Sequence, residues 1–454
     1  MAQTVRESTT AVSSTKTNQP AAIGRPPARW LKWLLWSRFR FLRDLAWRLA
    51  GLEGELFSPS DSAIRLLVGG DVVFDRVIRS TQYQGVHRLD EGRSRGSLRT
   101  RVRLKLWAVF SRFFLSPRFF STRVKRVSFP ELRIKSSWER GEPAWDRYNR
   151  DCVPFSNPSS VAAGYDYPFG KIASFLRERD LVLVNLETPL THHPRVRGFF
   201  RSDPHYAQAM KEAGISIVSL ANNHIFDVGE IGFLETLWTL QEAGILYTGA
   251  GSNLQEARKG CRVRIDDTEI AFLNYTQFCN ASYSSIAAEY PGILPLDRQL
   301  ILEDIEAVRG GVDLIFVVLH WGFEGQPNVH PKQVEIAHKL VDAGADGIIG
   351  HHPHVPHGIE VYKGQPILYS LGNFIFGHGA KRWSDNFLAE IVINQKRIQG
   401  IILYPVSGCG EELLQPRLLN GTRAEALLHE LQIKSAVFGT GIAIQDGVGY
   451  IKIQ

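Results

Sequence analysis

Five short polar motifs each follow an apolar run of the sequence, and their side chains are of types that bind metal ions. In chain order these motifs are Gly70-Asp71, Asn185-Leu186-Glu187, Ala221-Asn222-Asn223-His224, His320-Trp321-Gly322 and Gly350-His351-His352-Pro353-His354. Carboxylates, an amide oxygen and imidazoles, without a thiolate, form a ligand set that suits Mn²⁺, Fe, Zn²⁺ or Mg²⁺. The motifs therefore predict a site for one or two divalent ions.

A two-ion site of this composition has a defined chemistry. One carboxylate can bridge two ions about 3.5–4 Å apart, and such a pair polarises an ester or activates a water molecule. A histidine beside the pair can protonate a leaving group. Each residue alone also has an ordinary structural explanation, since Asp71 could cap a helix, Asn222 could form a turn and His320 could lie in the core. Three histidines within residues 351–354, combined with the other motifs, favour the metal site.

The elements that must position these motifs are strands and helices that alternate along the chain after residue 63. Apolar runs predict strands over Ile64–Gly70, Leu181–Glu187, Ile215–Leu220, Glu269–Tyr275, Asp313–Leu319, Asp346–Ile349 and Pro366–Leu371, and a hairpin over 387–406. Amphipathic patterns predict helices over Gly170–Arg179, Pro204–Ala213, Gly229–Ala243, Asp297–Val308 and Pro331–Ala343. This alternation indicates an α/β fold with much parallel pairing. In open α/β sheets, ligands bind beyond the carboxyl ends of the strands, which is where all five motifs fall.

Composition limits the class of protein and reveals an uneven charge. Of the 454 residues, 44% are apolar and 22% are charged, which excludes collagen, coiled coil and wholesale disorder. The net charge is +7, but residues 1–150 contain 29 Lys and Arg against 13 Asp and Glu. Residues 151–454 contain the remaining 24 of 53 basic residues and 33 of 46 acidic ones. A basic N-terminal third of this kind usually faces nucleic acid, a membrane surface or a polyanionic polymer.

The N-terminal region divides into two segments. Residues 1–27 are rich in Ser, Thr, Gln, Ala and Pro, which predicts a disordered tail. Residues 28–57 are predicted to form a basic amphipathic helix, with leucines on one face and tryptophans at its border. Through residues 28–52 this helix would lie on a membrane surface, or it would dock on its own domain or on a partner subunit. We find no signal peptide and no transmembrane helix, which predicts a cytoplasmic location or a peripheral one at the inner membrane face.

A basic insertion is predicted at about residues 80–160, where aromatic residues are interleaved with arginines. Such a surface could contact single-stranded nucleic acid, a membrane or a polymer. No nucleic-acid-binding motif accompanies it, so no specific nucleic acid is expected as a partner. A helical insertion that is solvated on its basic face is the simplest interpretation.

The motifs, in this combination and order, resemble those of the CapA family of capsule-synthesis (poly-γ-glutamate) proteins, a branch of the calcineurin-like metallophosphoesterase superfamily. The segments that carry the resemblance are Leu66–Arg76, Val184–Thr191, Val218–Gly229, Leu319–Glu324, Gly350–His354 and Tyr369–Phe376. The resemblance covers the chain from about residue 63 to the end. It implies an α/β fold arranged as a four-layer α/β/β/α sandwich with a two-metal centre.

The resemblance also assigns six residues as metal ligands, which are Asp71, Glu187, Asn223, His320, His352 and His354. Asp71 and His354 would hold the first ion, Glu187 would bridge, and the other three would hold the second ion. The wider superfamily begins with Asp-x-His, whereas Val73 stands two residues after Asp71 here. The first ion therefore has one ligand fewer. No role is implied for His351.

Three further residues receive roles from the resemblance. His224 would be the general acid, and Asp227 would orient it. Arg201 would pair with a phosphate or carboxylate of the substrate. The implied function is that of a metal-dependent hydrolase or transferase acting on an anionic cell-envelope polymer or a phosphoester. The alternative is a non-catalytic, membrane-associated component of a polymer synthesis or export machine, which the valine at position 73 and the basic segments would suit.

Overall fold

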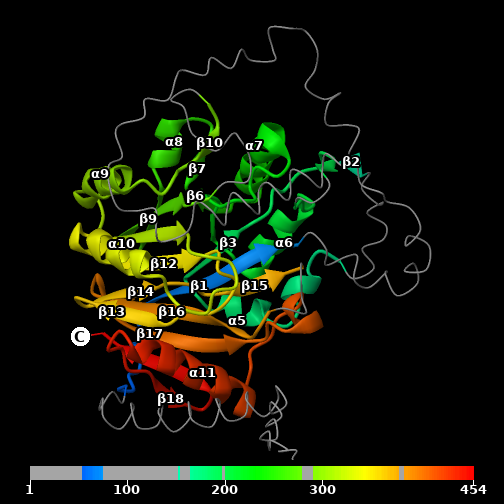
Figure 1. The fold of residues 1–454 in the computed structure, drawn as a ribbon. Coiled ribbons are helices and arrows are strands. Elements are labelled where there is room, and N and C mark those ends of the chain that lie inside the picture. Colours follow the sequence, from blue (N-terminus) through cyan, green and yellow to red (C-terminus); the bar gives the residue numbers. More distant parts are fainter. Residues whose placement is uncertain are drawn as a thin grey trace, which may run out of the picture. The chain divides into compact units, whose positions relative to one another are not determined.

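The computed structural model describes residues 54–74, 152–153, 164–196, 200–278, 290–377 and 383–453 (Figure 1). The predicted tail over 1–27, nearly all of the predicted helix over 28–57 and most of the predicted insertion at 80–160 lie outside these ranges. Residues 54–57 are described and are not helical, so the helix prediction extended too far. Instead, Glu55 pairs with Lys452 at 2.6 Å, and Phe57 packs edge-on against Tyr450.

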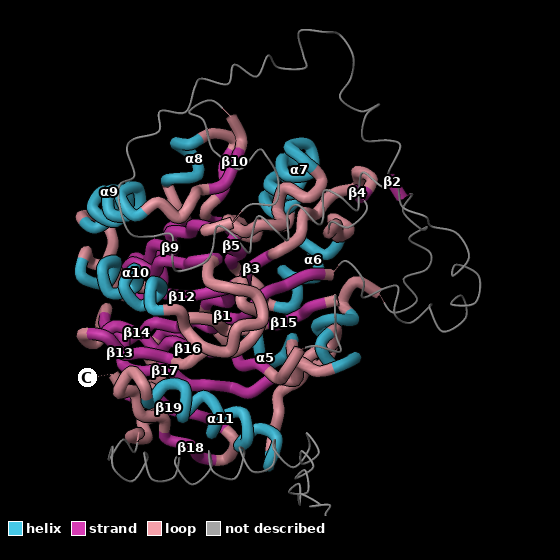
Figure 2. Tube along the Cα trace, viewed as in Figure 1, coloured by secondary structure: helices cyan, strands magenta, loops and turns pink. Residues whose placement is uncertain are grey.

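Two sheets form the framework of the described chain (Figure 2). The strands of the nine-stranded sheet, in spatial order, are β18 (Ala443–Gln445), β19 (Val448–Lys452), β17 (Arg397–Val406), β16 (Asn386–Asn394), β1 (Ile64–Val73), β3 (Leu181–Leu186), β5 (Ile217–Ser219) and β6 (Leu246–Thr248), with β15 (Asn373–Phe376) also paired to β1. Those of the six-stranded sheet are β13 (Ile359–Tyr362), β14 (Gln365–Leu368), β12 (Gly347–His351), β11 (Leu314–His320), β9 (Thr268–Thr276) and β8 (Cys261–Ile265). Two short pairs, β2 (Cys152–Val153) with β4 (Arg195–Val196) and β7 (Ala250–Gly251) with β10 (Gly292–Ile293), complete the strands.

Helices cover the outer faces of both sheets. The nine-stranded sheet carries α5 (Ala173–Arg177), α6 (His205–Ala213) and α7 (Gly229–Glu242), and the six-stranded sheet carries α8 (Leu254–Arg258), α9 (Arg298–Arg309) and α10 (Pro331–Asp342). Helix α11 (Gly421–Ala436) contacts β13, β17 and β19, and so spans the edges of the two sheets. The short 3-10 helices η4 (Tyr167–Phe169) and η5 (Gly410–Leu413) lie in connections. No helix within the described ranges is both long and apolar enough to cross a membrane.

The core consists of three apolar layers, which establish the order of the sheets and helices. Leu66 and Val68 of β1 belong to the same buried cluster as Phe316 of β11 and Phe272 of β9, between the two sheets. Leu67 points the opposite way and joins the layer under α5, α6 and α7. Such alternation is what a strand with both faces buried requires. A third layer packs between the six-stranded sheet and helices α8, α9 and α10. The predicted four-layer α/β/β/α sandwich is confirmed.

Most predicted elements are present, with shifts of at most three residues at either end. The largest change is in the helix predicted over Gly170–Arg179, which forms only the single turn of α5. Helix α7 ends before Gly244, whose φ of 66° is the left-handed conformation common after a helix. Several elements were not predicted, among them the short strands β6 and β13, the edge strand β8, the C-terminal strands β18 and β19, and helix α11.

Candidate metal centre

The carboxyl ends of the parallel strands in both sheets converge on one buried site. β1 and β3 run parallel with Asp71 beside Asn185, and β11 and β12 run parallel with His320 beside His351. Glu187 follows β3 directly, and its N–H donates to the carbonyl of Val72 at 3.0 Å. The sheet register thus brings together motifs that are far apart in the sequence, with 283 positions between Asp71 and His354 (354 − 71).

The first group of ligand atoms surrounds Nε2 of His320. Oδ1 of Asn223 lies 2.7 Å from this nitrogen, and Nδ1 of His352 lies 3.1 Å from it. Oε1 of Glu187 is 3.5 Å away. Ligand atoms bound to one ion at about 2.0–2.2 Å lie about 3–3.5 Å from each other. The three distances from Nε2 of His320 are therefore close to those expected within a single coordination sphere.

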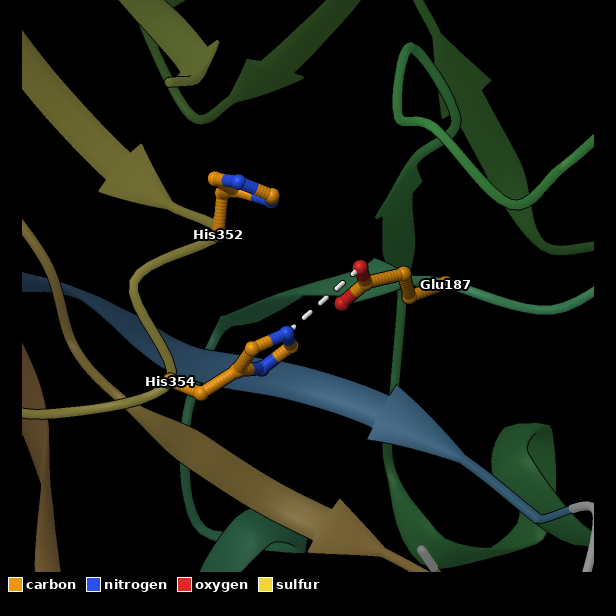
Figure 3. Close-up of side chains that lie close together, drawn as sticks. All are labelled: Glu187, His352 and His354. Carbon is orange, nitrogen blue, oxygen red and sulfur yellow. Dashed lines mark ion pairs between the residues drawn. The ribbon is translucent and has the colours of Figure 1, made fainter. Parts of the chain in front are cut away.

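The second group joins Asp71, His354 and Glu187. Nδ1 of His354 lies 3.0 Å from Oδ2 of Asp71, and its Nε2 lies 3.9 Å from Oε1 of Glu187. Figure 3 shows the Glu187 carboxylate and the imidazoles of His352 and His354 directed toward a common space. Glu187 takes part in both groups, and in each candidate trio that contains it the ligand atoms lie within 4.8 Å of one another. Glu187 is the residue that both trios share, and its role as a bridging ligand stays a prediction.

The ionisable side chains of the centre are buried, so their charges are costly unless something compensates them. Asp71, Glu187 and His320 have no exposed surface. Within the described part of the chain, three carboxylate oxygens receive no hydrogen bond. They are both oxygens of Glu187 and Oδ2 of Asp71. A buried carboxylate oxygen without a donor is costly to maintain. These oxygens and the surrounding donor set fit a divalent cation, which would compensate them.

The pKa values describe the ion-free centre consistently. Burial raises the pKa of Glu187 well above its ordinary value, and the charge of Asp71 adds to this. Burial lowers the pKa of His354, but the charges of Glu187 and Asp71 outweigh it and raise that pKa to about 9. Burial lowers the pKa of His352 to about 3 and that of His320 well below its usual range. His320 and His352 are therefore neutral and can offer lone pairs to a cation.

The turn that carries two of the histidines has an unusual backbone. His352 has a φ of 94° and His354 a φ of 59°, in the left-handed region that residues with a Cβ rarely adopt. Strain of this kind persists where the surrounding structure holds it, and it is concentrated at functional sites. Here it directs both imidazoles toward Glu187 (Figure 3).

His224 and Asp227 form a pair next to the two groups. Nδ1 of His224 lies 2.7 Å from Oδ2 of Asp227, and the same oxygen accepts the N–H of Phe200 at 2.7 Å. The Asp227 side chain is 1% exposed and that of His224 is 18% exposed, so only the imidazole reaches the surface. His224 directly follows the candidate ligand Asn223, which places the pair beside the centre. A carboxylate on Nδ1 directs Nε2 toward a proton-transfer partner.

Arg201 is buried and holds a loop. Its Nη1 donates to the carbonyl oxygens of His193 at 2.8 Å and of His192 at 3.4 Å. These residues lie in the connection that follows β3 and Glu187, so Arg201 holds that connection in place. Its predicted contact with a substrate anion stays a prediction.

Val73 lies in an apolar cluster, together with Phe200, Phe376, Trp383 and Leu413. Rings of this cluster pack on the candidate histidines, with Phe376 at 4.7 Å from His354 and Trp383 at 5.2 Å between centroids. The position that the wider superfamily fills with a histidine is thus part of a hydrophobic wall in this chain.

Two asparagines support the ligands, although the sequence suggested no role for them. Asn185 donates from Nδ2 to Oδ1 of Asp71 at 2.8 Å, and its own oxygen accepts from Ser219 at 3.1 Å. Asn373, the first residue of β15, accepts from Nδ1 of His354 at 2.9 Å. Both asparagines occur within motifs noted in the sequence, and their position beside the ligands at strand ends was the available signal.

Comparison with known proteins decides the family. The family model for bacterial capsule synthesis proteins (PGA_cap) matches residues 65–378. The chain belongs to this family. The capsule biosynthesis protein CapA of Bacillus anthracis is 34% identical over 239 residues, which are 50% of this chain and 58% of that protein. The PGA biosynthesis protein CapA of Bacillus subtilis is 31% identical over 233 residues, covering 50% of this chain and 61% of the relative. The chain thus spans about three fifths of the length of these two relatives.

More distant similarities extend to other named proteins. A probable polyglutamine synthesis accessory protein of Mycobacterium tuberculosis is 29% identical over 269 residues, covering 54% of this chain and 71% of that protein. Among solved structures, the calcineurin-like phosphoesterase YfkN of Bacillus subtilis matches 59% of this chain and 83% of its own, with 13% identity and a TM-score of 0.30. The NAD nucleotidase of Haemophilus influenzae matches 55% of this chain and 43% of its own, with 16% identity and a TM-score of 0.30.

Proposed function

We propose that this member of the capsule synthesis family is a metal-dependent hydrolase or transferase that acts on an anionic cell-envelope polymer or a phosphoester. The observation that carries the proposal is the pair of buried ligand groups that share Glu187. The His224–Asp227 pair beside them adds the means of proton transfer. The names of the Bacillus relatives support poly-γ-glutamate or capsule material as the polymer.

The side chains divide the work between holding ions and moving a proton. Asp71 and His354 would hold one ion, Asn223, His320 and His352 would hold another, and Glu187 would bridge. Ions bound there would polarise an ester and lower the pKa of a bound water molecule.

The acid–base step falls to the pair next to the ligands. His224 would deliver a proton from Nε2 to the leaving group, which is the oxygen of a phosphoester or the nitrogen of a γ-glutamyl amide. Asp227 would hold its Nδ1–H and fix the orientation of the ring. Phe200 packs on the His224 ring at 4.1 Å between centroids and limits access of water from that side.

The experiment measures bound ions and turnover on the same protein. Protein purified without chelator is analysed for Mn, Fe, Zn and Mg, and is assayed on bis(p-nitrophenyl) phosphate and on poly-γ-glutamate. We expect one or two divalent ions per chain. The His224→Ala variant should keep its ions and lose about 10²–10⁴-fold in turnover, as is typical when a general acid is removed. Wild-type protein without any divalent ion would refute the proposal.

A non-catalytic role in polymer synthesis or export is the second candidate. The apolar environment of Val73 favours it, because the first ion has one ligand fewer there. The test is capsule formation in cells that carry Asn223→Ala or His320→Ala in place of the wild-type gene. Full capsule formation by both variants would establish the non-catalytic role and reject the enzyme.

A further inference from the structure

His351 is a buried histidine at the centre that the ligand assignment does not use. It is the last residue of β12 and is 1% exposed. Within the described ranges, neither of its ring nitrogens forms a hydrogen bond of ordinary geometry. Buried polar groups without partners are rare, and each calls for an explanation. Among the residues that the structure describes, the neighbouring His352 belongs to a candidate ligand trio, whereas His351 belongs to none.

The polar group facing His351 is the carboxylate of Asp71. Nδ1 of His351 lies 3.4 Å from Oδ1 of Asp71. The same oxygen accepts from Nδ2 of Asn185 at 2.8 Å. The other oxygen, Oδ2, faces Nδ1 of His354 at 3.0 Å. The two oxygens of Asp71 therefore have separate surroundings, one facing supporting residues and the other facing a candidate ligand.

The contact also crosses between the two sheets. Asp71 belongs to β1 of the nine-stranded sheet, and His351 belongs to β12 of the six-stranded sheet. The backbone of His351 is held by contacts that do not involve Asp71. His351 pairs with His320 of the neighbouring strand β11, and its carbonyl accepts the N–H of Trp321 at 3.1 Å. A side chain held this firmly can set the orientation of a carboxylate on the opposite sheet.

We infer that His351 is a positioning residue for Asp71: its Nδ1 faces Oδ1 at 3.4 Å and favours the carboxylate orientation that presents Oδ2 to the ion. This inference rests on the proposed metal centre. Groups that orient metal ligands in this way typically contribute about 10–100-fold to metal affinity. The role belongs to Nδ1 specifically, since Nδ1 is the nitrogen nearest the carboxylate.

Substitutions can separate this role from simple packing. In His351→Asn the amide nitrogen takes the place of Nδ1, whereas His351→Leu fills the space without any donor. Calorimetric titration with Mn²⁺ alone measures the affinity of each full-length variant. We expect His351→Leu to weaken the tighter binding step about 10–100-fold, and His351→Asn to stay close to wild type.

A matched control is His357→Leu. His357 is also 1% exposed, but its Nε2 donates to the carbonyl of Gln326 and contacts no candidate ligand. This variant should unfold at a lower temperature and bind Mn²⁺ like wild type.

The outcomes distinguish the inference from the proposed function. Wild-type affinity in His351→Leu would overturn the inference and leave the metal centre standing. Equal loss in the leucine and asparagine variants would also overturn it, because packing rather than Nδ1 would then matter. Absence of Mn²⁺ binding by the wild type would reject the metal centre itself, and the inference with it.

Discussion

Gly70 is the position where one added methyl group should damage the centre without removing any ligand. It directly precedes Asp71 on β1, and β1 pairs there with the segment 372–376. The N–H of Asp71 donates to the carbonyl of Gly372 at 3.0 Å. Asn373, which follows Gly372, accepts a hydrogen bond from Nδ1 of His354 at 2.9 Å. The close approach of these two backbones therefore sets the relative positions of Asp71 and His354.

The structure gives the size of the disturbance in Gly70→Ala. A Cβ at residue 70 would lie 2.8 Å from the carbonyl carbon of Gly372 and closer still to its oxygen, whereas ordinary contacts begin at 3.4 Å. The backbones must therefore separate by at least the 0.6 Å difference between these two distances. Overpacking of this kind typically costs about 1–3 kcal/mol. Because Asp71 moves with the strand, we also expect about 10–100-fold weaker Mn²⁺ binding, the range seen when the support of a ligand is lost.

The adjacent glycine provides the control. The atoms nearest to a Cβ at Gly69 would belong to the side chains of Val184, at 3.1 Å, and Leu388, at 3.2 Å. These side chains can move by the few tenths of an ångström that the added atom requires. Thermal unfolding and Mn²⁺ titration are measured on Gly69→Ala, Gly70→Ala and wild type. Gly69→Ala should resemble wild type in Mn²⁺ affinity. If Gly70→Ala matched Gly69→Ala in both measurements, the idea that this backbone contact positions Asp71 would be wrong.

Three further predictions concern stability. Chelation should lower the unfolding temperature, because an ion at 100 times its Kd stabilises by about 2.7 kcal/mol; equal unfolding with and without Mn²⁺ would contradict this. Burial, aided by the charge of Lys434, lowers the pKa of His357 to about 4. The contribution of His357 to stability should therefore fall as pH drops from about 6.5 toward 4, by about 1.4 kcal/mol per unit. The pH slope in urea unfolding of His357→Gln should be smaller by that amount. Arg179 and Glu390 form an ion pair at 2.9 Å, with side chains 4% and 0% exposed. Arg179→Met alone should lower the free energy of unfolding by about 3–5 kcal/mol, because it leaves the charge of Glu390 buried. The double variant Arg179→Met, Glu390→Gln should lose clearly less, as measured by urea unfolding.

The sequence was most informative where chemistry and periodicity coincide. β11 and β12 are apolar strands that end in a histidine, and β3 is an apolar strand with Glu187 directly after it. A polar group after such a run is conspicuous, and the carboxyl ends of parallel strands share one edge. The convergence of the motifs could therefore be predicted before any coordinates were known.

Contacts between distant segments could not be predicted in this way. The approach of His351 to Asp71 depends on how two sheets face each other, which no local pattern encodes. The same holds for Arg201, whose guanidinium contacts backbone carbonyls nine and eight residues earlier. Edge strand β8 was missed because its exposed arginines interrupt the apolar pattern of a buried strand. Helix α11 packs over the edges of both sheets, and its place depends on that assembly.

The candidate ligands divide by chemistry between the two sheets. Those from the nine-stranded sheet and the connections after its strands all offer oxygen, and they are Asp71, Glu187 and Asn223. Those from the six-stranded sheet and its connections all offer nitrogen, and they are His320, His352 and His354. An ion bound here would therefore join the two sheets directly, beyond the apolar layer that already holds them together. Without the ion, the buried oxygens of Glu187 lack hydrogen-bond donors within the described chain and favour separation of the two edges. Ion binding and packing of the two sheets at this edge should thus be coupled, and hydrogen exchange at the carboxyl ends of β3 and β11 should slow when Mn²⁺ is added.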